Sequence, residues 1–330
     1  LNISGIQILL KSKDLNTKNI VLLQVLPHLN SGGLVSGAVE VGIAVSKHGG
    51  KSIILSSGGY KESALKRNNC ILEFLGVDTK NPLKIYLNVN KICKIIEKYN
   101  VNIIHARSRA PAWSAYFAAK RKGVAFVTTF HGTYGIENYL KKLYNSIMVK
   151  GDAIIAISKF IKEHIKKNYN VQKSIQVIPR GVDIDFFSPK KVSNARMISL
   201  ANKLKITEVD YTILMPGRLT EWKGQKQAIK ALSMIKTSNV KLIIVGDMQQ
   251  RNKYKDSLMR YANTLDVQRY IIFVEHSRDL PAFMMLSDLI LSCSTKPEAF
   301  GRVILEAQAM GRPIIAYNHG GAVELLNENE

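Results

Sequence analysis

The chain alternates short apolar runs, rich in β-branched residues, with longer stretches whose apolar residues recur at helical spacing. This alternation is typical of parallel βα units, because strands that are buried on both faces read as continuous apolar runs. In the first half of the chain we expect strands at residues 20–26, 52–57, 102–106, 125–131, 153–158 and 175–178. Helices are expected at residues 89–99, 111–120 and 159–167, where lysines lie opposite the apolar residues.

A polar stretch at residues 188–202 interrupts the pattern, and a second series of strands follows. Its members are expected at residues 211–215, 241–245, 270–274, 289–293 and 313–317. The sequence therefore predicts an α/β protein with two Rossmann-like, doubly wound parallel-sheet domains, at residues 20–185 and 186–330, after an N-terminal extension at 1–19. Because ligands of open parallel sheets bind beyond the carboxyl ends of the strands, we expect the two domains to face a common cleft.

Composition places the chain among globular proteins, with 46% hydrophobic and 22% charged residues. The longest apolar runs are shorter than the ~20 residues of a membrane-spanning helix, and the first residues lack the long apolar stretch of a secretory signal. Cys70, Cys93 and Cys293 are far apart, which predicts neither a disulfide framework nor a zinc motif. We expect a reducing, cytoplasmic setting.

The formal net charge is +22, and residues 20–185 carry about +14 of it. A strongly basic half predicts an anionic partner, such as a phospholipid surface or a phosphorylated glycolipid. Compositional drift toward lysine, with the charges simply solvated, is the alternative. Nucleic acid is the least expected partner, because no nucleic-acid-binding motif with interleaved aromatic residues accompanies the charge.

Two cations follow the first strand of the second domain. Arg218 comes directly after Gly217, and Lys223 precedes Gly224 at the predicted start of a helix. Cations near a helix N-terminus can neutralise a diphosphate and stabilise its charge as it leaves. The alternative interpretation is a pair of ordinary surface cations.

Two carboxylates follow the strand that ends at residue 293. Glu298 lies in the loop after the strand, and Glu306 lies in a helix predicted to begin near Gly301. A loop carboxylate can accept hydrogen bonds from sugar hydroxyls, and a helix carboxylate can hold a ribose diol. The backbone N–H groups of Phe300 and Gly301 are placed like an anion-binding nest.

In the first domain, polar residues occur where predicted strands end. His131 ends one strand, and His105 ends another, followed by Arg107 and Arg109. The two arginines could meet an anionic acceptor, or cap the following helix and face water. Gly33, after the first strand, opens a helix whose N-terminus could approach a phosphate, although a Gly-Gly pair is also an ordinary turn.

Over roughly residues 20–326 these segments resemble glycosyltransferase family 4, whose members have the GT-B fold of two facing Rossmann-like domains. The most specific element is Pro-Glu-Ala-Phe-Gly-x4-Glu, which contains Glu298 and Glu306. Gly217-Arg218-x4-Lys223-Gly224 stands upstream of it, and Pro179-Arg180-Gly181-Val182-Asp183 resembles the segment that usually precedes the domain crossover.

The resemblance implies roles for individual positions. Arg218 and Lys223 would bind the donor diphosphate, Glu298 the transferred sugar and Glu306 the ribose. His131 would lie at the sugar and Gly33 would admit the phosphate. The full predicted donor-binding set is Gly33, Arg218, Lys223, Glu298, Phe300, Gly301, Leu305 and Glu306, with His131, Glu298, Arg218 and Lys223 as the catalytic group. The predicted acceptor residues are His105, Arg107 and Arg109.

Family members transfer sugars with retention of anomeric configuration and generally need no metal, so we expect no metal and no cofactor besides the nucleotide-sugar substrate. The chain departs from the family in two places. Val35 and Ser36 stand where many members carry an acidic and then a basic residue. The chain also ends at Glu330, whereas members continue into a helix that returns to the first domain, so we expect a truncated second domain with reduced stability or activity.

The expected function is transfer of a hexose or similar sugar from a nucleoside-diphosphate sugar to an envelope glycolipid or lipopolysaccharide-type acceptor, by an enzyme on the inner face of the membrane. A sugar-nucleotide epimerase of the same architecture is one alternative. A catalytically impaired remnant that binds only nucleotide or lipid is another.

Overall fold

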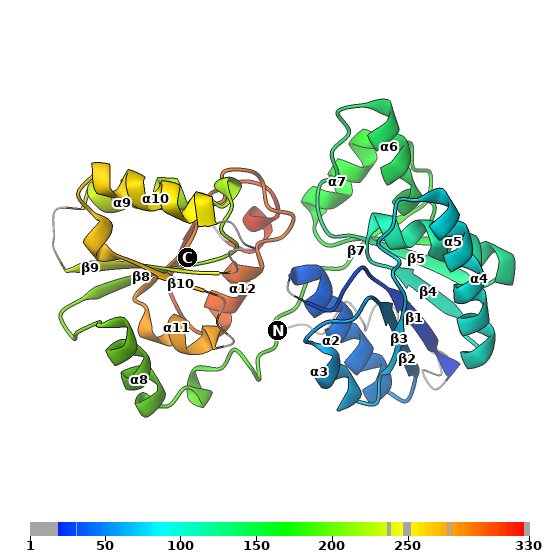
Figure 1. Cartoon of the computed structure of the whole chain (residues 1–330), viewed down its shortest axis with the longest axis horizontal. Coiled ribbons are helices and arrows are strands. Elements are labelled where there is room, and N and C mark those ends of the chain that lie inside the picture. The colour runs from blue at the N-terminus through cyan, green and yellow to red at the C-terminus, as the bar shows by residue number, and fades with distance from the viewer. Residues whose placement is uncertain are drawn as a thin grey trace. The chain divides into compact units, whose positions relative to one another are not determined.

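Two parallel sheets, one in each half of the chain, form the framework of the computed structural model (Figure 1). The structure describes residues 19–30, 32–235, 239–246, 252–275, 277 and 279–326, so the predicted N-terminal extension lies outside it except for its last residue. The chain divides into an N-terminal unit, Leu1–Arg180, and a C-terminal unit, Gly181–Glu330. This division lies slightly before the predicted boundary at residues 185 and 186, and the predicted common cleft stays a prediction.

The N-terminal unit contains a seven-stranded sheet in the order β3-β2-β1-β4-β5-β6-β7. The strands are β1 (Val21–Val25), β2 (Lys51–Ser56), β3 (Ile71–Phe74), β4 (Ile103–Ala106), β5 (Ala125–Phe130), β6 (Ala153–Ala156) and β7 (Ile175–Val177). The six predicted strands are confirmed. The sequence missed β3 because this edge strand is only partly buried and includes the charged Glu73, so it lacks a continuous apolar run.

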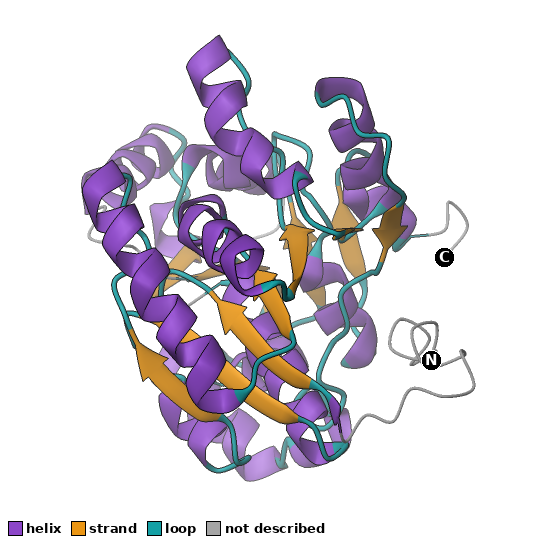
Figure 2. Ribbon diagram, turned by 90° about the vertical axis from the view of Figure 1, so that its right-hand side faces the viewer, coloured by secondary structure: helices purple, strands orange, loops and turns teal. Residues whose placement is uncertain are grey.

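Helices cover both faces of this sheet (Figure 2). They are α2 (Gly33–Lys47), α3 (Glu62–Lys66), α4 (Pro82–Tyr99), α5 (Arg109–Lys122), α6 (Tyr139–Asn145) and α7 (Lys159–Asn168). Helices α2 and α3 pack on one face around buried Leu26, Leu29 and Ile54. Because parallel crossovers are right-handed, the connections that run the other way along the sheet place α4 and α5 on the opposite face.

Helix α4 begins earlier than the predicted residue 89. The Asn81 side chain accepts a hydrogen bond from the Leu83 N–H at 2.9 Å, and Pro82 occupies the first turn, where its missing N–H costs nothing. The sequence pattern hid this first part of the helix because its apolar residues are exposed. Leu83, Tyr86 and Leu87 are 67%, 58% and 48% exposed.

The C-terminal unit contains a five-stranded sheet in the order β10-β9-β8-β11-β12. Its strands are β8 (Tyr211–Pro216), β9 (Val240–Val245), β10 (Ile271–Val274), β11 (Leu289–Ser292) and β12 (Ile314–Ala316), and all five were predicted. Helices α9 (Gln225–Ser233) and α10 (Asn252–Thr264) lie on one face of the sheet, while α8 (Asn194–Leu204) and α11 (Leu280–Leu286) lie on the other (Figure 1). Helix α12 (Arg302–Ala309) shares the core of α8 and α11.

The prediction that residues 188–202 form an interruption between domains is wrong in part, because α8 occupies much of this stretch. Its Met197, Leu200 and Leu204 pack against the same core as α11. No residue of α8 is fully buried, which explains why its apolar spacing was hidden among polar neighbours.

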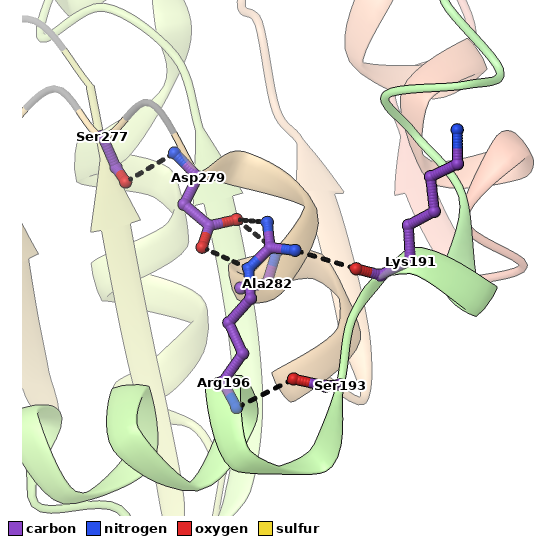
Figure 3. A network of polar contacts seen from close by, with 6 residues as sticks. All are labelled: Lys191, Ser193, Arg196, Ser277, Asp279 and Ala282. Atoms are coloured by element: carbon purple, nitrogen blue, oxygen red, sulfur yellow. Dashed lines mark hydrogen bonds and ion pairs between the residues drawn. The ribbon is translucent and has the colours of Figure 1, made fainter.

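An arginine–carboxylate contact joins α8 to the start of α11 (Figure 3). The guanidinium of Arg196 makes two hydrogen bonds to the Asp279 carboxylate, one of them 2.7 Å from Nε to Oδ2, and a third at 2.9 Å to the carbonyl oxygen of Lys191. Asp279 also caps α11 by accepting from the Ala282 N–H at 3.2 Å. The hydrogen bond from Arg196 is the main cause of a lowered pKa at Asp279.

Replacing Asp279 should separate its capping role from its charge. We expect Asp279→Ala to lower the free energy of unfolding by about 1–2 kcal/mol, and Asp279→Asn, which keeps an acceptor oxygen, by less than about 1 kcal/mol because the pair is partly exposed to water. A lowered pKa stabilises the fold above the unfolded-state value of about 3.9 and ceases to do so as the pH falls through the folded-state value. Urea unfolding at about pH 7 and pH 3 should therefore show a smaller effect of Asn at the lower pH, and equal losses at both would contradict this assignment.

Candidate functional site

The carboxyl edge of the C-terminal sheet brings together the loops that follow β8 and β11, which are neighbouring strands. The loop after β8 contains a short 3-10 helix, Glu221–Lys223, and then Gly224 with φ +84°. A Cβ atom on Gly224 would overlap the carbonyl oxygen of Cys293 at the end of β11. Only glycine allows the two loops to approach this closely.

Lys223 and Glu298 form an ion pair at this edge, with Lys223 Nζ 2.6 Å from Glu298 Oε1. Their side chains are only 15% and 16% exposed. Ser294 Oγ donates to the same carboxylate oxygen, and Lys223 Nζ lies 4.6 Å from the centre of the Trp222 ring. The structure thus joins two predicted site residues that are far apart in the sequence, and it rejects the interpretation of Lys223 as a solvated surface cation.

Arg218 differs from Lys223 because its side chain is exposed. Its backbone carbonyl accepts from Gln225 Nε2 at 3.0 Å, which fixes the loop but leaves the guanidinium outside that contact. With Trp222, Tyr254 and Lys296, among others, Arg218 lines an open hollow of about 680 Å³ within the C-terminal unit. The two predicted diphosphate cations therefore differ in their surroundings: Lys223 is held by a carboxylate, and the side chain of Arg218 is exposed to solvent.

The loop at residues 297–301 is held by the chain that follows β12. The Gly321 N–H donates to the Glu298 carbonyl oxygen at 2.7 Å, and Gly320, with φ +69°, lies so close that a Cβ atom would be 2.6 Å from that oxygen. This contact fixes the backbone that carries the Glu298 carboxylate. Two glycines that the sequence interpretation did not assign to the site thus support it.

Helix α12 starts after this loop, with Gly301 (φ +95°) as its N-cap. Phe300 is buried, and Leu305 is partly buried. Glu306 is only 8% exposed, and its Oε1 accepts from Arg302 Nε at 3.0 Å, one turn earlier on the helix. The ion pair is the physical reason that a carboxylate is stable in this apolar setting, and the ribose-binding role of Glu306 stays a prediction.

The glycine loop of the N-terminal unit comes after β1. Gly32 has φ +114° and precedes α2, which begins at Gly33. A Cβ atom at Gly33 would meet no other heavy atom within 4 Å. No described residue requires glycine at this position, and open space in front of a helix N-terminus is a place that an anion could occupy.

His105, Arg107 and His131 lie at the carboxyl ends of β4 and β5. His105 is buried and its Nε2 lies 2.7 Å from Thr129 Oγ1. Arg107 is 3% exposed, and its guanidinium donates two hydrogen bonds to Gln24 Oε1 on β1. Both side chains are buried, so an acceptor molecule could contact them only by reaching into the interior at the ends of β4 and β5.

The third predicted acceptor residue, Arg109, is oriented differently. Its Nη1 donates to Asn145 Oδ1 at 3.0 Å, and its guanidinium carbon lies 4.6 Å from the centre of the Tyr134 ring. Asn145 in turn donates to the Gly135 carbonyl at 2.7 Å. Arg109 therefore links α5 to the chain around α6, and the role of the three residues in acceptor binding stays a prediction.

The site missed by the sequence interpretation is centred on Arg180, which follows β7. Its Nη2 lies 2.5 Å from Nδ1 of His131. Burial, followed by the positive charges of Arg180 and Arg107, holds the pKa of His131 well below its usual range. Burial and Arg180 also lower the pKa of Arg107 to about 9. Arg180 stood within the quoted Pro-Arg-Gly-Val-Asp segment, but only the order of strands reveals that this segment reaches His131.

Among the described residues, no group of three or more His, Cys, Asp or Glu side chains could hold a metal ion. In the part of the chain that the structure describes, no helix is both long enough and apolar enough to cross a membrane.

The contact of Gly224 with the end of β11 can be tested by substitution. We expect Gly224→Ala to destabilise the protein by more than about 2 kcal/mol, because the added methyl meets backbone that cannot move away cheaply. Gly311→Ala is the matched control: Gly311 also has positive φ, +60°, but its Cβ would meet nothing within 4 Å, so we expect only about 1 kcal/mol of backbone strain. Urea unfolding measures both, and equal losses would refute the role of the close contact.

Two family models match the chain in succession. The model described as Glycosyltransferase Family 4 matches residues 31–186, and the model described as Glycosyl transferases group 1 matches residues 198–330. Each match coincides largely with one of the two sheets.

Solved structures resemble the whole described fold. A glycosyltransferase from Rickettsia africae is 40% identical, with a TM-score of 0.85, over 94% of this chain and 82% of that one. HepE from Anabaena, solved in complex with UDP and glucose, is 22% identical, with a TM-score of 0.82, over 94% of this chain and 84% of that one. At this level of identity, the second comparison shows the fold alone.

Among curated proteins, the chain is 22% identical to the alpha-monoglucosyldiacylglycerol synthase of Streptococcus pneumoniae, over 74% of this chain and 58% of that protein. It spans less than two thirds of the length of the first curated relatives that it matches. Two parallel-sheet units, each matched by its own family model, together with a structural relative at 40% identity, establish the assignment: the chain belongs to glycosyltransferase family 4 and has the GT-B fold.

Proposed function

We propose that the chain transfers a sugar, with retention of configuration, from a nucleoside diphosphate to an anionic glycolipid at the inner face of the membrane. The observation that carries the proposal is the Lys223–Glu298 ion pair at the carboxyl edge of the C-terminal sheet. A cation and a carboxylate held 2.6 Å apart match the two ends of the bond to be broken, because the phosphate side is negative and the sugar side offers hydroxyl donors.

The ion pair is an arrangement that a donor would remodel. A diphosphate would draw Lys223 toward its oxygens, aided by the exposed Arg218, and would release Glu298 to accept hydrogen bonds from sugar hydroxyls. Lysine and arginine then supply the positive charge that stabilises the leaving group, so the proposed mechanism needs no metal. Ser294 Oγ, which donates to the Glu298 carboxylate, would keep that carboxylate oriented while it accepts from the sugar, in the retaining reaction without an enzyme-bound sugar that we propose.

The remaining roles follow the same geometry. Glu306, anchored by Arg302 on α12, would accept from the ribose diol, and the Phe300–Gly301 backbone at the start of that helix would contact phosphate or sugar oxygens. In the N-terminal unit, Gly33 would leave room for the donor phosphate and His131 would lie at the sugar. UDP-glucose is the first donor to test, since UDP and glucose occupy the similarly folded Anabaena protein.

The acceptor side rests on a surface of the N-terminal unit, here called the docking face. It consists of exposed apolar side chains on three helices: Leu83, Tyr86 and Leu87 on α4, Phe117 on α5, and Tyr139, Leu140 and Leu143 on α6. Tyr139 and Leu140 are 76% and 75% exposed. Exposed aromatic and aliphatic residues of this kind, flanked by lysines, are typical of helices that lie in a membrane interface.

Ring contacts beneath this surface join α5 to α6. The Trp113 ring lies 6.2 Å from Phe117 and 6.1 Å from Tyr144 on α6, and Lys80, just before α4, lies 5.8 Å from the Tyr144 ring. Helix α4 also packs directly on α5, so the three helices that carry the docking face are neighbours. Lys84, Lys141 and Lys142 are exposed beside it and would contact anionic headgroups. The lipid product in the name of the streptococcal relative supports a lipid acceptor.

Donor binding can be tested by thermal denaturation with UDP, GDP and ADP and their common sugar conjugates. A ligand that binds only the folded state raises the melting temperature by mass action, and one nucleotide should do so far more than the others. We expect Lys223→Ala and Glu306→Ala to remove most of this rise in melting temperature, because each variant loses about 1.5–3 kcal/mol of charge-assisted hydrogen bonding to the nucleotide.

Lys241→Ala is the matched control, because Lys241 is a similarly buried lysine of the same unit, 4.0 Å from Asp210, that lies outside the predicted site. Absence of any shift with any nucleotide would overturn the proposal. Hydrolysis or epimerisation of the donor without a glycosylated lipid product would favour a sugar-nucleotide epimerase instead.

Membrane docking can be tested by co-sedimentation with vesicles of phosphatidylglycerol and phosphatidylcholine. We expect the protein to bind vesicles that contain the anionic lipid, and the triple variant Tyr139→Ser, Leu140→Ser, Leu143→Ser to bind about tenfold more weakly or worse, because three apolar side chains no longer enter the interface.

The control for this test is the double variant Val209→Ser, Met234→Ser, which changes comparably exposed apolar residues of the C-terminal unit. It should bind as the wild type does. If the triple variant binds the vesicles as tightly as the wild type and the control variant do, charge alone, and not the docking face, attracts the protein to the membrane.

A further inference from the structure

Arg180 contacts the ring of His131 in a way that determines where the histidine carries its proton. Arg180 Nη2 lies 2.5 Å from His131 Nδ1. A guanidinium has only donors, so Nδ1 must be the acceptor in this hydrogen bond. An imidazole that accepts at Nδ1 is neutral and carries its one proton on Nε2.

The position of Arg180 is itself prepared by the fold. Arg180 comes shortly after β7, and β7 is separated from β5, which precedes His131, only by β6. On the other side, the guanidinium lies against the backbone of α2 at Gly37, where a Cβ atom would overlap Arg180 Nη1. Glycine inside a helix is less favourable than alanine by about 1 kcal/mol. The space that Gly37 leaves for the Arg180 guanidinium, here called the seat of Arg180, is a reason for glycine at this position.

The charged groups around His131 act in the same direction. Arg180, Arg107 and, to the smallest extent, His105 all oppose a second proton on the ring, while the Tyr134 phenol is hydrogen-bonded to the backbone of His131. The nearby carboxylate, Glu40, acts on Arg107, where it opposes the lowering of the pKa. Burial and the neighbouring cations hold the pKa of His131 well below its usual range. His131 Nε2 has no hydrogen-bond partner in the part of the chain that the structure describes.

We infer that Arg180 is a positioning residue, which fixes His131 as a neutral imidazole that offers a single N–H donor at Nε2 to an oxygen of the bound substrate. Gly37 makes this possible by leaving room for the guanidinium. His131 then acts as a hydrogen-bond donor to a sugar hydroxyl or a departing oxygen and not as a base. The inference deepens the proposed function, since it concerns the same histidine.

The tautomer can be read directly from the two-bond proton–nitrogen couplings of histidine in protein labelled with ¹⁵N and free of ligand. The chain has 7 histidines, and the signals of His131 are those that disappear in His131→Gln. We expect protonated Nε2 and unprotonated Nδ1 between about pH 6 and 8, on both sides of the usual histidine pKa of about 6.5. A proton on Nδ1, or titration near the usual value, would overturn the inference.

Two variants displace the guanidinium by different routes. Arg180→Met removes it, and Gly37→Ala pushes it from its seat while favouring the helix. Both should raise the pH at which His131 takes up its second proton and should add signal from the Nδ1–H tautomer. If both variants leave the His131 signals as in the wild type, Arg180 does not position the ring.

Ser46→Ala is the control on α2, roughly 13 Å along the helix from Gly37 at about 1.5 Å per residue, and it should leave the spectrum of His131 unchanged. A change equal to that of Gly37→Ala would also count against the inference. The measurement uses the ligand-free protein, so it decides the role of Arg180 even if no sugar transfer is observed. Conversely, sugar transfer can be confirmed even if His131 carries its proton on Nδ1.

Discussion

The parallel strand order of each sheet is the constraint on which the candidate site depends. In the N-terminal unit, β1 lies between β2 and β4, and in the C-terminal unit β8 lies between β9 and β11. The connection after β1 runs one way along its sheet and the connection after β4 runs the other way, and the same holds for β8 and β11, so the loops that follow these neighbouring strands diverge at the carboxyl edge. The Lys223–Glu298 pair lies where this divergence occurs in the C-terminal unit, whereas His131 and Arg180 follow β5 and β7, further along the carboxyl edge of the N-terminal sheet. Each unit therefore presents its charged residues as a result of topology rather than of any single motif.

Electrostatics at the two edges differ in kind. The C-terminal edge combines opposite charges, Lys223 with Glu298 and Arg302 with Glu306, so each ion has a partner that a ligand can replace. The N-terminal edge gathers cations and neutral imidazoles around Arg107, whose charge is met by the amide oxygen of Gln24 and by the carboxylate of Glu40. Burying like charges is costly, and the lowered pKa values of Arg107 and His131 express that cost. Such an environment favours an anion or an electron-rich oxygen, in keeping with a phosphorylated or sugar ligand.

Much of the fold could be predicted because buried parallel strands leave an unambiguous pattern, and eleven predicted strands are present. The exceptions have physical causes. Edge strand β3 and helix α8 are only partly buried, so their residues are not selected for continuous or periodic apolarity. The residues of the C-terminal site were found because sequence motifs follow adjacent strands. Arg180 was not, since its contact with His131 depends on the order of three strands and on a glycine in a helix, which no local pattern contains.

The seat of Arg180 against Gly37 links two positions that are 143 residues apart in the sequence. A side chain at position 37 and a guanidinium at position 180 cannot occupy the same space. Among homologous proteins, the two positions should therefore vary together: arginine should accompany glycine, and shorter residues at position 180 should accompany alanine or serine at position 37. Such paired substitution would arise from packing alone. Through this contact, the residues that evolution allows on α2 depend on the loop that follows β7, the last strand of the N-terminal sheet.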